Sequence, residues 1–289
     1  MIIEKESEIK VLRNFYNSPF DYFSVAEISK RTNISRNWIY RVINKFEKSF
    51  ILSKDGKKFK LDFSNLFCKR LKLLFDSEYL SCLEPKTRDK VFNISNKIIF
   101  EIKPKSIVLV GSAALYKLRK ESDTDFFVVG DAKEMPHLES CNIIIMSERE
   151  LKEKYLKGDD FVISALLFGK IIFDENVFIK IYENPLPIFS QELIQEKVKY
   201  CERLKDRVYT LLKMDEQQAR KELLYLALQV ARIILLRNNI TPKTKHDIAG
   251  QVSQFDKRIA KIIQSLLKEK KASKEKILEH MRVCMEILK

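Results

Sequence analysis

The chain has 289 residues, and its 54 lysines and arginines outnumber its 40 aspartates and glutamates, which gives a formal net charge of +14. A hydrophobic fraction of 45% is enough to build buried cores, so composition excludes an intrinsically disordered chain. No apolar run reaches the length of about 18 residues that a membrane-spanning helix needs, so no membrane partner is expected.

The positive charge favours polyanionic partners, namely nucleic acids, nucleotides or anionic lipid. The alternative is a lysine-rich, solvated surface with no polyanion bound to it. The five cysteines are scattered, with no closely spaced pair, which argues against a zinc site and against a disulfide framework. The N-terminus, MIIEKESEIK, lacks the apolar core of a secretory signal, so a cytoplasmic location is expected.

The first 65 residues have the pattern of three helices followed by a hairpin. Apolar side chains recur at helical spacing over residues 8–16. Ser24 and Glu27 have the spacing of a capping box, and Ser35 is the expected cap of the next helix. Asp55-Gly56, between two short β-type runs, is a hairpin signal. This order resembles a winged helix-turn-helix domain.

That resemblance implies contact with double-stranded DNA through a recognition helix over residues 35–48. Its expected DNA-binding residues are Arg36, Asn37, Tyr40 and Arg41 on the early, outward part of the helix, and Lys57 and Lys58 on the wing. The alternative is that the same domain is a protein-interaction module.

The rest of the chain divides into three parts. An amphipathic linker helix is expected over residues 66–85, and it could supply the seam of a homodimer. Over residues 86–187, a helix precedes the apolar runs SIVLV, DFFVVG and CNIIIMS, which predict a small buried mixed sheet. Residues 188–289 are helical in pattern throughout and predict a helical bundle. The expected fold class is therefore multidomain α+β.

The stretch GSAALYKLRKESDTD at residues 111–125 is the strongest candidate for a functional site. Gly111 lets the backbone approach a phosphate, and Ser112 begins the next helix, where free N–H groups favour anions. Asp123 and Asp125 flank or begin a strand, and side chains two residues apart on a strand point the same way. Two carboxylates on one face can hold Mg²⁺. The alternative is a capped helix followed by a solvated turn.

This stretch has Gly-Ser, then ten residues, then Asp-x-Asp. The pattern resembles that of the nucleotidyltransferase superfamily related to DNA polymerase beta, and most of all its minimal nucleotidyltransferases. The resemblance covers about residues 86–186. It implies that Gly111 and Ser112 bind the phosphates of an NTP substrate. It also implies that Asp123 and Asp125 are catalytic residues that bind Mg²⁺.

Two positions depart from the family pattern. Leu115 and Tyr116 stand where the minimal family has Arg-Gly. The family's third carboxylate aligns with Asn142, whose amide oxygen can ligate a metal but cannot take up a proton. Asn142 is therefore included among the predicted metal ligands, with Glu139 as a nearby substitute.

The C-terminal stretch LRNNITPKTKHDIAGQVSQF resembles the HEPN-like helical domains that partner these nucleotidyltransferases. HEPN ribonucleases use an arginine and a histidine four to six residues apart. Arg237 and His246 are too far apart for that pattern, so a binding or structural role is expected for His246.

The sequence thus predicts a nucleotidyltransferase that moves NMP from an NTP to a hydroxyl acceptor with Mg²⁺, coupled to a DNA-binding winged helix. The alternative is a DNA-binding transcriptional regulator or antitoxin-like module whose transferase domain binds nucleotide without turnover. Asn142 and the missing Arg-Gly favour this alternative. An RNA-processing factor would share the same basic surface.

Overall fold

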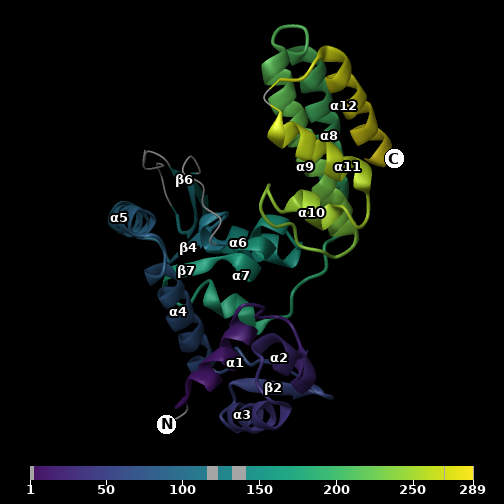
Figure 1. The fold of residues 1–289 in the computed structure, drawn as a ribbon. Coiled ribbons are helices and arrows are strands. Elements are labelled where there is room, and N and C mark those ends of the chain that lie inside the picture. Colours follow the sequence, from purple (N-terminus) through teal and green to yellow (C-terminus); the bar gives the residue numbers. More distant parts are fainter. Residues whose placement is uncertain (1–2, 116–122, 132–140, 270, 289) are drawn as a thin grey trace. The chain divides into compact units, whose positions relative to one another are not determined.

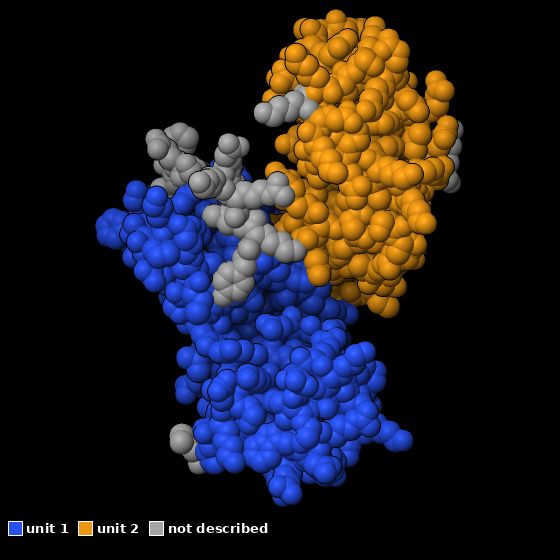
Figure 2. Space-filling view, viewed as in Figure 1, with its two compact units in different colours: residues 1–153, 165–186 blue, residues 154–164, 187–289 orange. Residues whose placement is uncertain are grey.

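The computed structural model describes the whole chain except residues 1–2, 116–122, 132–140, 270 and 289. The chain forms two compact units, drawn in different colours in Figure 2. The first unit contains residues 1–153 and 165–186, and the second contains residues 154–164 and 187–289. Within the described ranges, no helix combines the length and the apolar character needed to cross a bilayer.

The first unit begins with the helices and hairpin predicted for residues 1–65 (Figure 1). In chain order these are α1 (Glu6–Tyr16), β1 (Phe23–Ser24), α2 (Val25–Thr32), α3 (Arg36–Lys48), β2 (Leu52–Asp55) and β3 (Lys58–Leu61). The three short strands form an antiparallel sheet in the order β1-β3-β2. Their identification as a winged helix-turn-helix remains a prediction.

Local sequence signals explain where these elements begin and end. The Ser24 hydroxyl accepts a bond from the Glu27 backbone N–H, and the Glu27 carboxylate accepts one from the Ser24 backbone N–H, which confirms the capping box. Ser35 does precede α3, but its side chain makes no capping hydrogen bond, so that part of the prediction is wrong. The hairpin turn consists of Gly56 and Lys57, and Gly56 supplies the positive φ of 57° that a two-residue loop needs.

Two long helices and a four-stranded sheet complete the first unit. The helices are α4 (Leu66–Ser81) and α5 (Pro85–Ile102), and the strands are β4 (Ser106–Val110), β5 (Thr124–Val129), β6 (Cys141–Met146) and β7 (Lys170–Asp174). The strand order is β6-β5-β4-β7. β5 and β6 are parallel, whereas β4 is antiparallel to both β5 and β7. The predicted mixed sheet is therefore confirmed.

The two faces of this sheet have different surroundings. One face packs on α4 and α5 through a buried core that includes Leu109, Phe126 and Val128. On the other face, the ring of Phe127 packs edge-on against Phe178, which lies just before a short 3₁₀ turn at Ile179–Glu183. Because side chains alternate along a strand, Asp125 shares the face of Phe127 and points away from the α4–α5 core.

The remaining elements in the described part of the chain are helices. Two of them, α6 (Glu148–Leu156) and α7 (Asp160–Phe168), lie between β6 and β7 along the chain. After it come α8 (Gln191–Leu211), α9 (Glu216–Arg237), α10 (Ile248–Val252), α11 (Lys257–Lys268) and α12 (Lys274–Leu288). α9 is the central helix of the second unit, since its side chains from Leu223 to Leu236 are mostly buried.

Candidate functional site

The candidate site lies where three neighbouring strands of the four-stranded sheet meet the Gly-Ser turn. Gly111 directly follows β4, and Asp125 is paired with Val110 on the adjacent strand. Asn142 of β6 is the register partner of Asp125. The structure therefore brings Gly111, Asp125 and Asn142 together at one end of the sheet, although up to 31 positions separate them along the chain.

Gly111 and Asp125 are packed against each other so closely that no side chain fits between them. Gly111 has a φ of 69°, which lies in the left-handed region that disfavours other residues. A Cβ atom at this position would overlap Oδ2 of Asp125. Glycine is therefore required here both by its backbone conformation and by the approach of the carboxylate.

Ser112 is half-buried and opens a short 3₁₀ helix at Ala113–Leu115. Its carbonyl oxygen accepts a hydrogen bond of 3.2 Å from the backbone N–H of Leu115. The longer helix expected after Ser112 would continue into residues 116–122, which lie outside the described part of the chain, as does Tyr116.

Asp125 and Asn142 are joined by a direct hydrogen bond. Nδ2 of Asn142 donates to Oδ1 of Asp125 across 2.9 Å. In this rotamer the amide nitrogen, rather than the carbonyl oxygen, faces the carboxylate. Asn142 would have to turn its amide over before both side chains could offer oxygens to the same cation. Glu139, the other candidate for the third ligand, lies outside the described residues.

Asp123 is exposed and lies just before β5, two residues ahead of the half-buried Asp125. Both aspartates lie close enough to Cys141 to act on its thiol. Burial is the main cause that raises the pKa of Cys141, Asp123 and Asp125 raise it further, and Lys90 opposes them. The two predicted carboxylates therefore form one patch of negative charge at the end of β5.

These residues suit a hard cation. Asp123 and Asp125 provide carboxylate oxygens, and Asn142 can add an amide oxygen, which are the donors that Mg²⁺ takes in proteins. Mg²⁺ commonly uses one or two protein carboxylates and completes its shell with substrate phosphates and water. Among the residues described, no cluster of three or more histidines, cysteines, aspartates or glutamates could hold a metal. The described residues thus provide two carboxylates at this site, those of Asp123 and Asp125.

A contact that sequence reasoning missed supports the Gly-Ser turn from behind. The hydroxyl of Tyr79, on α4, donates a 2.8 Å hydrogen bond to the carbonyl oxygen of Ala113. Tyr79 lies 34 positions before Ala113, in the predicted linker helix, and no local sequence signal links the two. The helix α4 thus also holds the turn that follows Ser112.

A second candidate surface is the outward side of α3. Arg36, Asn37, Tyr40 and Arg41 are all exposed, as are Lys57 and Lys58 at the hairpin. Asn44 and Lys48 continue the same helical face at i+3 and i+7 from Arg41. No acidic side chain in the described ranges forms an ion pair with Arg36, Arg41 or Lys48.

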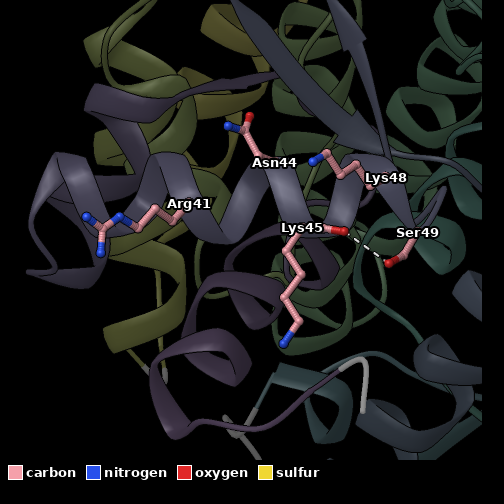
Figure 3. A pocket seen from close by; sticks show the side chains of 5 residues that line it. All are labelled: Arg41, Asn44, Lys45, Lys48 and Ser49. Atoms are coloured by element: carbon pink, nitrogen blue, oxygen red, sulfur yellow. Dashed lines mark hydrogen bonds between the residues drawn. The ribbon is translucent and has the colours of Figure 1, made fainter.

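This face borders a shallow hollow of about 470 Å³, whose lining residues are drawn in Figure 3. They are Arg41, Asn44, Lys45, Lys48 and Ser49. Lys45 differs from the other basic residues because its ammonium is 2.9 Å from the buried carboxylate of Glu8. Arg41 and Lys48 are therefore the cations of this hollow that remain available to an external anion.

The middle of the chain is similar to a known family. A family model described as a nucleotidyltransferase domain matches residues 93–223. The match includes Gly111, Ser112, Asp123, Asp125 and Asn142, and it continues through α8 into α9. The residues that meet at the end of the sheet therefore lie inside a region with the sequence character of nucleotidyltransferase domains.

One of the solved structures that match the chain has low sequence identity to it. It is described as a nucleotidyltransferase-like protein from Exiguobacterium sibiricum 255-15, and the likeness covers 76% of this chain and 74% of that one, with 14% identity and a TM-score of 0.39. No curated protein matches the sequence.

Proposed function

We propose that the protein is a nucleotidyltransferase that transfers NMP from an NTP to a hydroxyl acceptor. The observation that carries the proposal is the meeting of Gly111, Asp125 and Asn142 within the segment that matches the nucleotidyltransferase model. In the reaction the acceptor oxygen forms a bond to the α-phosphorus, the bond to the β-phosphate bridge breaks, and pyrophosphate leaves with its electron pair.

Each residue has a proposed part in binding. The backbone N–H groups of the turn at Gly111 and Ser112 are proposed to bind a phosphate, and the Ser112 hydroxyl to donate a hydrogen bond to it. Asp123 and Asp125 are proposed to hold Mg²⁺, and the Asn142 amide oxygen to complete their set. The bound cation would neutralise the charge of the triphosphate. Asn142 cannot accept the acceptor's proton, so that proton must pass to an aspartate or to solvent.

The Asn142–Asp125 hydrogen bond favours a second candidate function. An amide donor beside Asp125 satisfies one carboxylate oxygen without a metal, as in a site that has lost its third acidic residue. In this alternative the transferase segment binds nucleotide without turnover and the protein is a DNA-binding regulator or antitoxin-like module.

DNA binding is proposed under both candidates. The exposed face of α3 with Arg36, Asn37, Tyr40 and Arg41 would enter the major groove, while Lys57 and Lys58 would contact phosphate. The proposed domains are a winged helix-turn-helix at 1–65, a linker helix at 66–85, a transferase domain at 86–187 and a HEPN-like bundle at 188–289.

Incubation with labelled ATP, GTP, CTP or UTP and Mg²⁺, together with cellular RNA, protein and small-molecule fractions, tests the transferase function. We expect label in one fraction and its loss in the Asp125→Ala variant. Asp131→Ala is the matched control, because Asp131 is an exposed aspartate just beyond the other end of β5. Saturable nucleotide binding without label transfer would support the regulator instead, and the absence of both would refute both candidates.

A further inference from the structure

The first unit contains a cavity of about 250 Å³ between α1, α4 and the start of β7. The wall residues that matter are Arg13 of α1, Phe75, Asp76, Glu78 and Tyr79 of α4, and Lys170 of β7. The cavity lies on the opposite side of the sheet from Asp125. Lys170 pairs with Leu109, whose side chain faces the α4–α5 core. The cavity is thus separate from the candidate transferase site.

Counting Lys72, which lies behind the wall and pairs with Asp76, three cations stand against two carboxylates around this cavity. Arg13 forms an ion pair with Glu78, and the buried Lys72 forms one with Asp76, so each of these charges is compensated. Within the described part of the chain, Lys170 has neither an ion pair nor a hydrogen bond to its ammonium. Its Nζ stands 4.8 Å from the centroid of the Tyr79 ring. The cavity therefore has one cation in excess.

Lys170 is mostly enclosed by the protein, and its surroundings penalise its charge. Burial, and after it the nearby Lys72, lower the pKa of its ammonium to about 8, while Asp76 opposes the shift. A buried ammonium without an acceptor is costly to keep, and a negative charge within reach would remove much of that cost. The chain itself supplies Asp76, but that carboxylate already binds Lys72 and the backbone N–H of Ile171.

We propose that this cavity binds a small organic anion that carries one carboxylate or phosphate group on a flat apolar body. The acidic group would pair with Lys170, and the apolar body would lie against the rings of Phe75 and Tyr79. Because Lys170 is one cation without a paired carboxylate, the ligand should carry a single anionic group. The cavity volume of about 250 Å³ suits a small molecule rather than a polymer.

The position of the cavity makes such an anion an effector. Tyr79 contacts Lys170 through its ring and holds the Ala113 carbonyl through its hydroxyl, one residue beyond Ser112. On the other side, α1 contributes Arg13 and is tied to α4 by the hydrogen bond of 2.8 Å from the Tyr16 hydroxyl to the carbonyl of Cys68. A ligand in the cavity would thus bias both the Gly-Ser turn and the first helix of the segment proposed to bind DNA.

Thermal unfolding of the full chain with benzoate, phenyl phosphate and neutral benzamide tests this proposal. We expect saturable stabilisation by at least one of the two anions, by about 3 °C or more at saturation. Benzamide, which has the same ring without the charge, should have no effect. Benzoate and phenyl phosphate distinguish a carboxylate site from a phosphate site.

Three variants locate the effect. Lys170→Met should abolish the stabilisation and Lys170→Arg should retain it, while Lys180→Met, which removes an exposed lysine of the same unit, should leave it unchanged. Hydrogen exchange should become slower at residues 111–115 when the anion binds. Equal stabilisation by benzamide, or by either anion in Lys170→Met, would overturn the site, and binding without slower exchange would overturn the effector role.

Discussion

The carboxamide of Asn142 donates a hydrogen bond of 2.9 Å to the carboxylate of Asp125, its register partner on the neighbouring parallel strand. In this position a second carboxylate would repel Asp125 unless a cation lay between them. The amide instead makes the pair stable in the absence of metal. The identity of this one residue therefore decides whether the pair is stable without a cation between its two side chains.

Asn142→Asp should make the stability of the protein depend on Mg²⁺. Without metal, the loss of the hydrogen bond and the new repulsion should lower the free energy of unfolding by about 1–2 kcal/mol. Mg²⁺ should restore it. Chemical unfolding with and without Mg²⁺ measures both effects. The control is Asn142→Ala, which loses the same hydrogen bond but gains no charge, and equal Mg²⁺ responses in the two variants would contradict the prediction.

Gly111→Ala should disrupt the site more than its backbone strain explains. The matched control is Gly56→Ala, because Gly56 has a similar φ of 57° but open space where a Cβ would stand. Both variants should lose about 1 kcal/mol or more from strain. Only Gly111→Ala must also displace Asp125, so it alone should weaken nucleotide binding, as titration with a fluorescent NTP would measure. Unchanged binding in Gly111→Ala would refute a role for this turn.

Arg41→Ala and Lys45→Ala should separate DNA binding from stability. Arg41 has no acidic partner among the described residues, so its removal should weaken DNA binding and reduce the salt slope by about 1, with little change in stability. Lys45→Ala removes the cation beside the buried Glu8 carboxylate, which keeps only its hydrogen bonds from the backbone N–H groups of Glu4 and Lys5, and should lower stability instead. Fluorescence anisotropy over a salt series and thermal unfolding measure the two effects. The reverse pattern would exclude this face of α3 as the DNA contact.

Lys170→Met should stabilise the unliganded protein at neutral pH. The pKa of Lys170 is about 8 in the folded chain against 10.5 for an ordinary lysine, so between these values the unfolded chain binds more protons. Wild-type stability should therefore gain a contribution as pH rises from about 8 to 10.5. Below pH 8 the buried charge costs up to about 3 kcal/mol, which the variant avoids.

Urea unfolding of both proteins at pH 7 and at pH 10 measures this difference. The advantage of Lys170→Met should be largest at pH 7 and should shrink at pH 10, where wild-type Lys170 is mostly neutral when folded. An advantage that does not depend on pH would mean that methionine acts through packing alone.

Much of the fold follows from short-range sequence patterns. The capping box at Ser24 and Glu27 and the apolar runs of β4, β5 and β6 each depend on neighbours a few residues apart, and the structure has the expected elements there. The missing side-chain cap at Ser35 is a local exception, because the residue occupies the cap position without forming the bond.

The candidate site could be predicted in part for the same reason. Gly111 and Asp125 both lie in the stretch 111–125. Asn142 aligns with an expected carboxylate, and the register of β5 and β6 places it beside Asp125. Whether that pair binds metal or turns over nucleotide remains a prediction.

Contacts between distant segments carried no sequence signal. The Tyr79–Ala113 hydrogen bond and the approach of Lys170 to Tyr79 depend on how α4 packs against the sheet. Helical periodicity predicts that α4 has a buried side, but it does not say which strand that side meets. The cavity beside Lys170 could therefore not be predicted from the sequence.

Asp76 has a consequence for the behaviour of the protein at high concentration. β7 is an outer strand of its sheet, and such strands offer unpaired N–H groups to strands of other molecules. The Asp76 carboxylate accepts the N–H of Ile171 at 2.9 Å, so α4 occupies part of that exposed edge. The ion pair of Asp76 with Lys72 holds the carboxylate in place. This helix thus protects the sheet from edge-to-edge aggregation between chains.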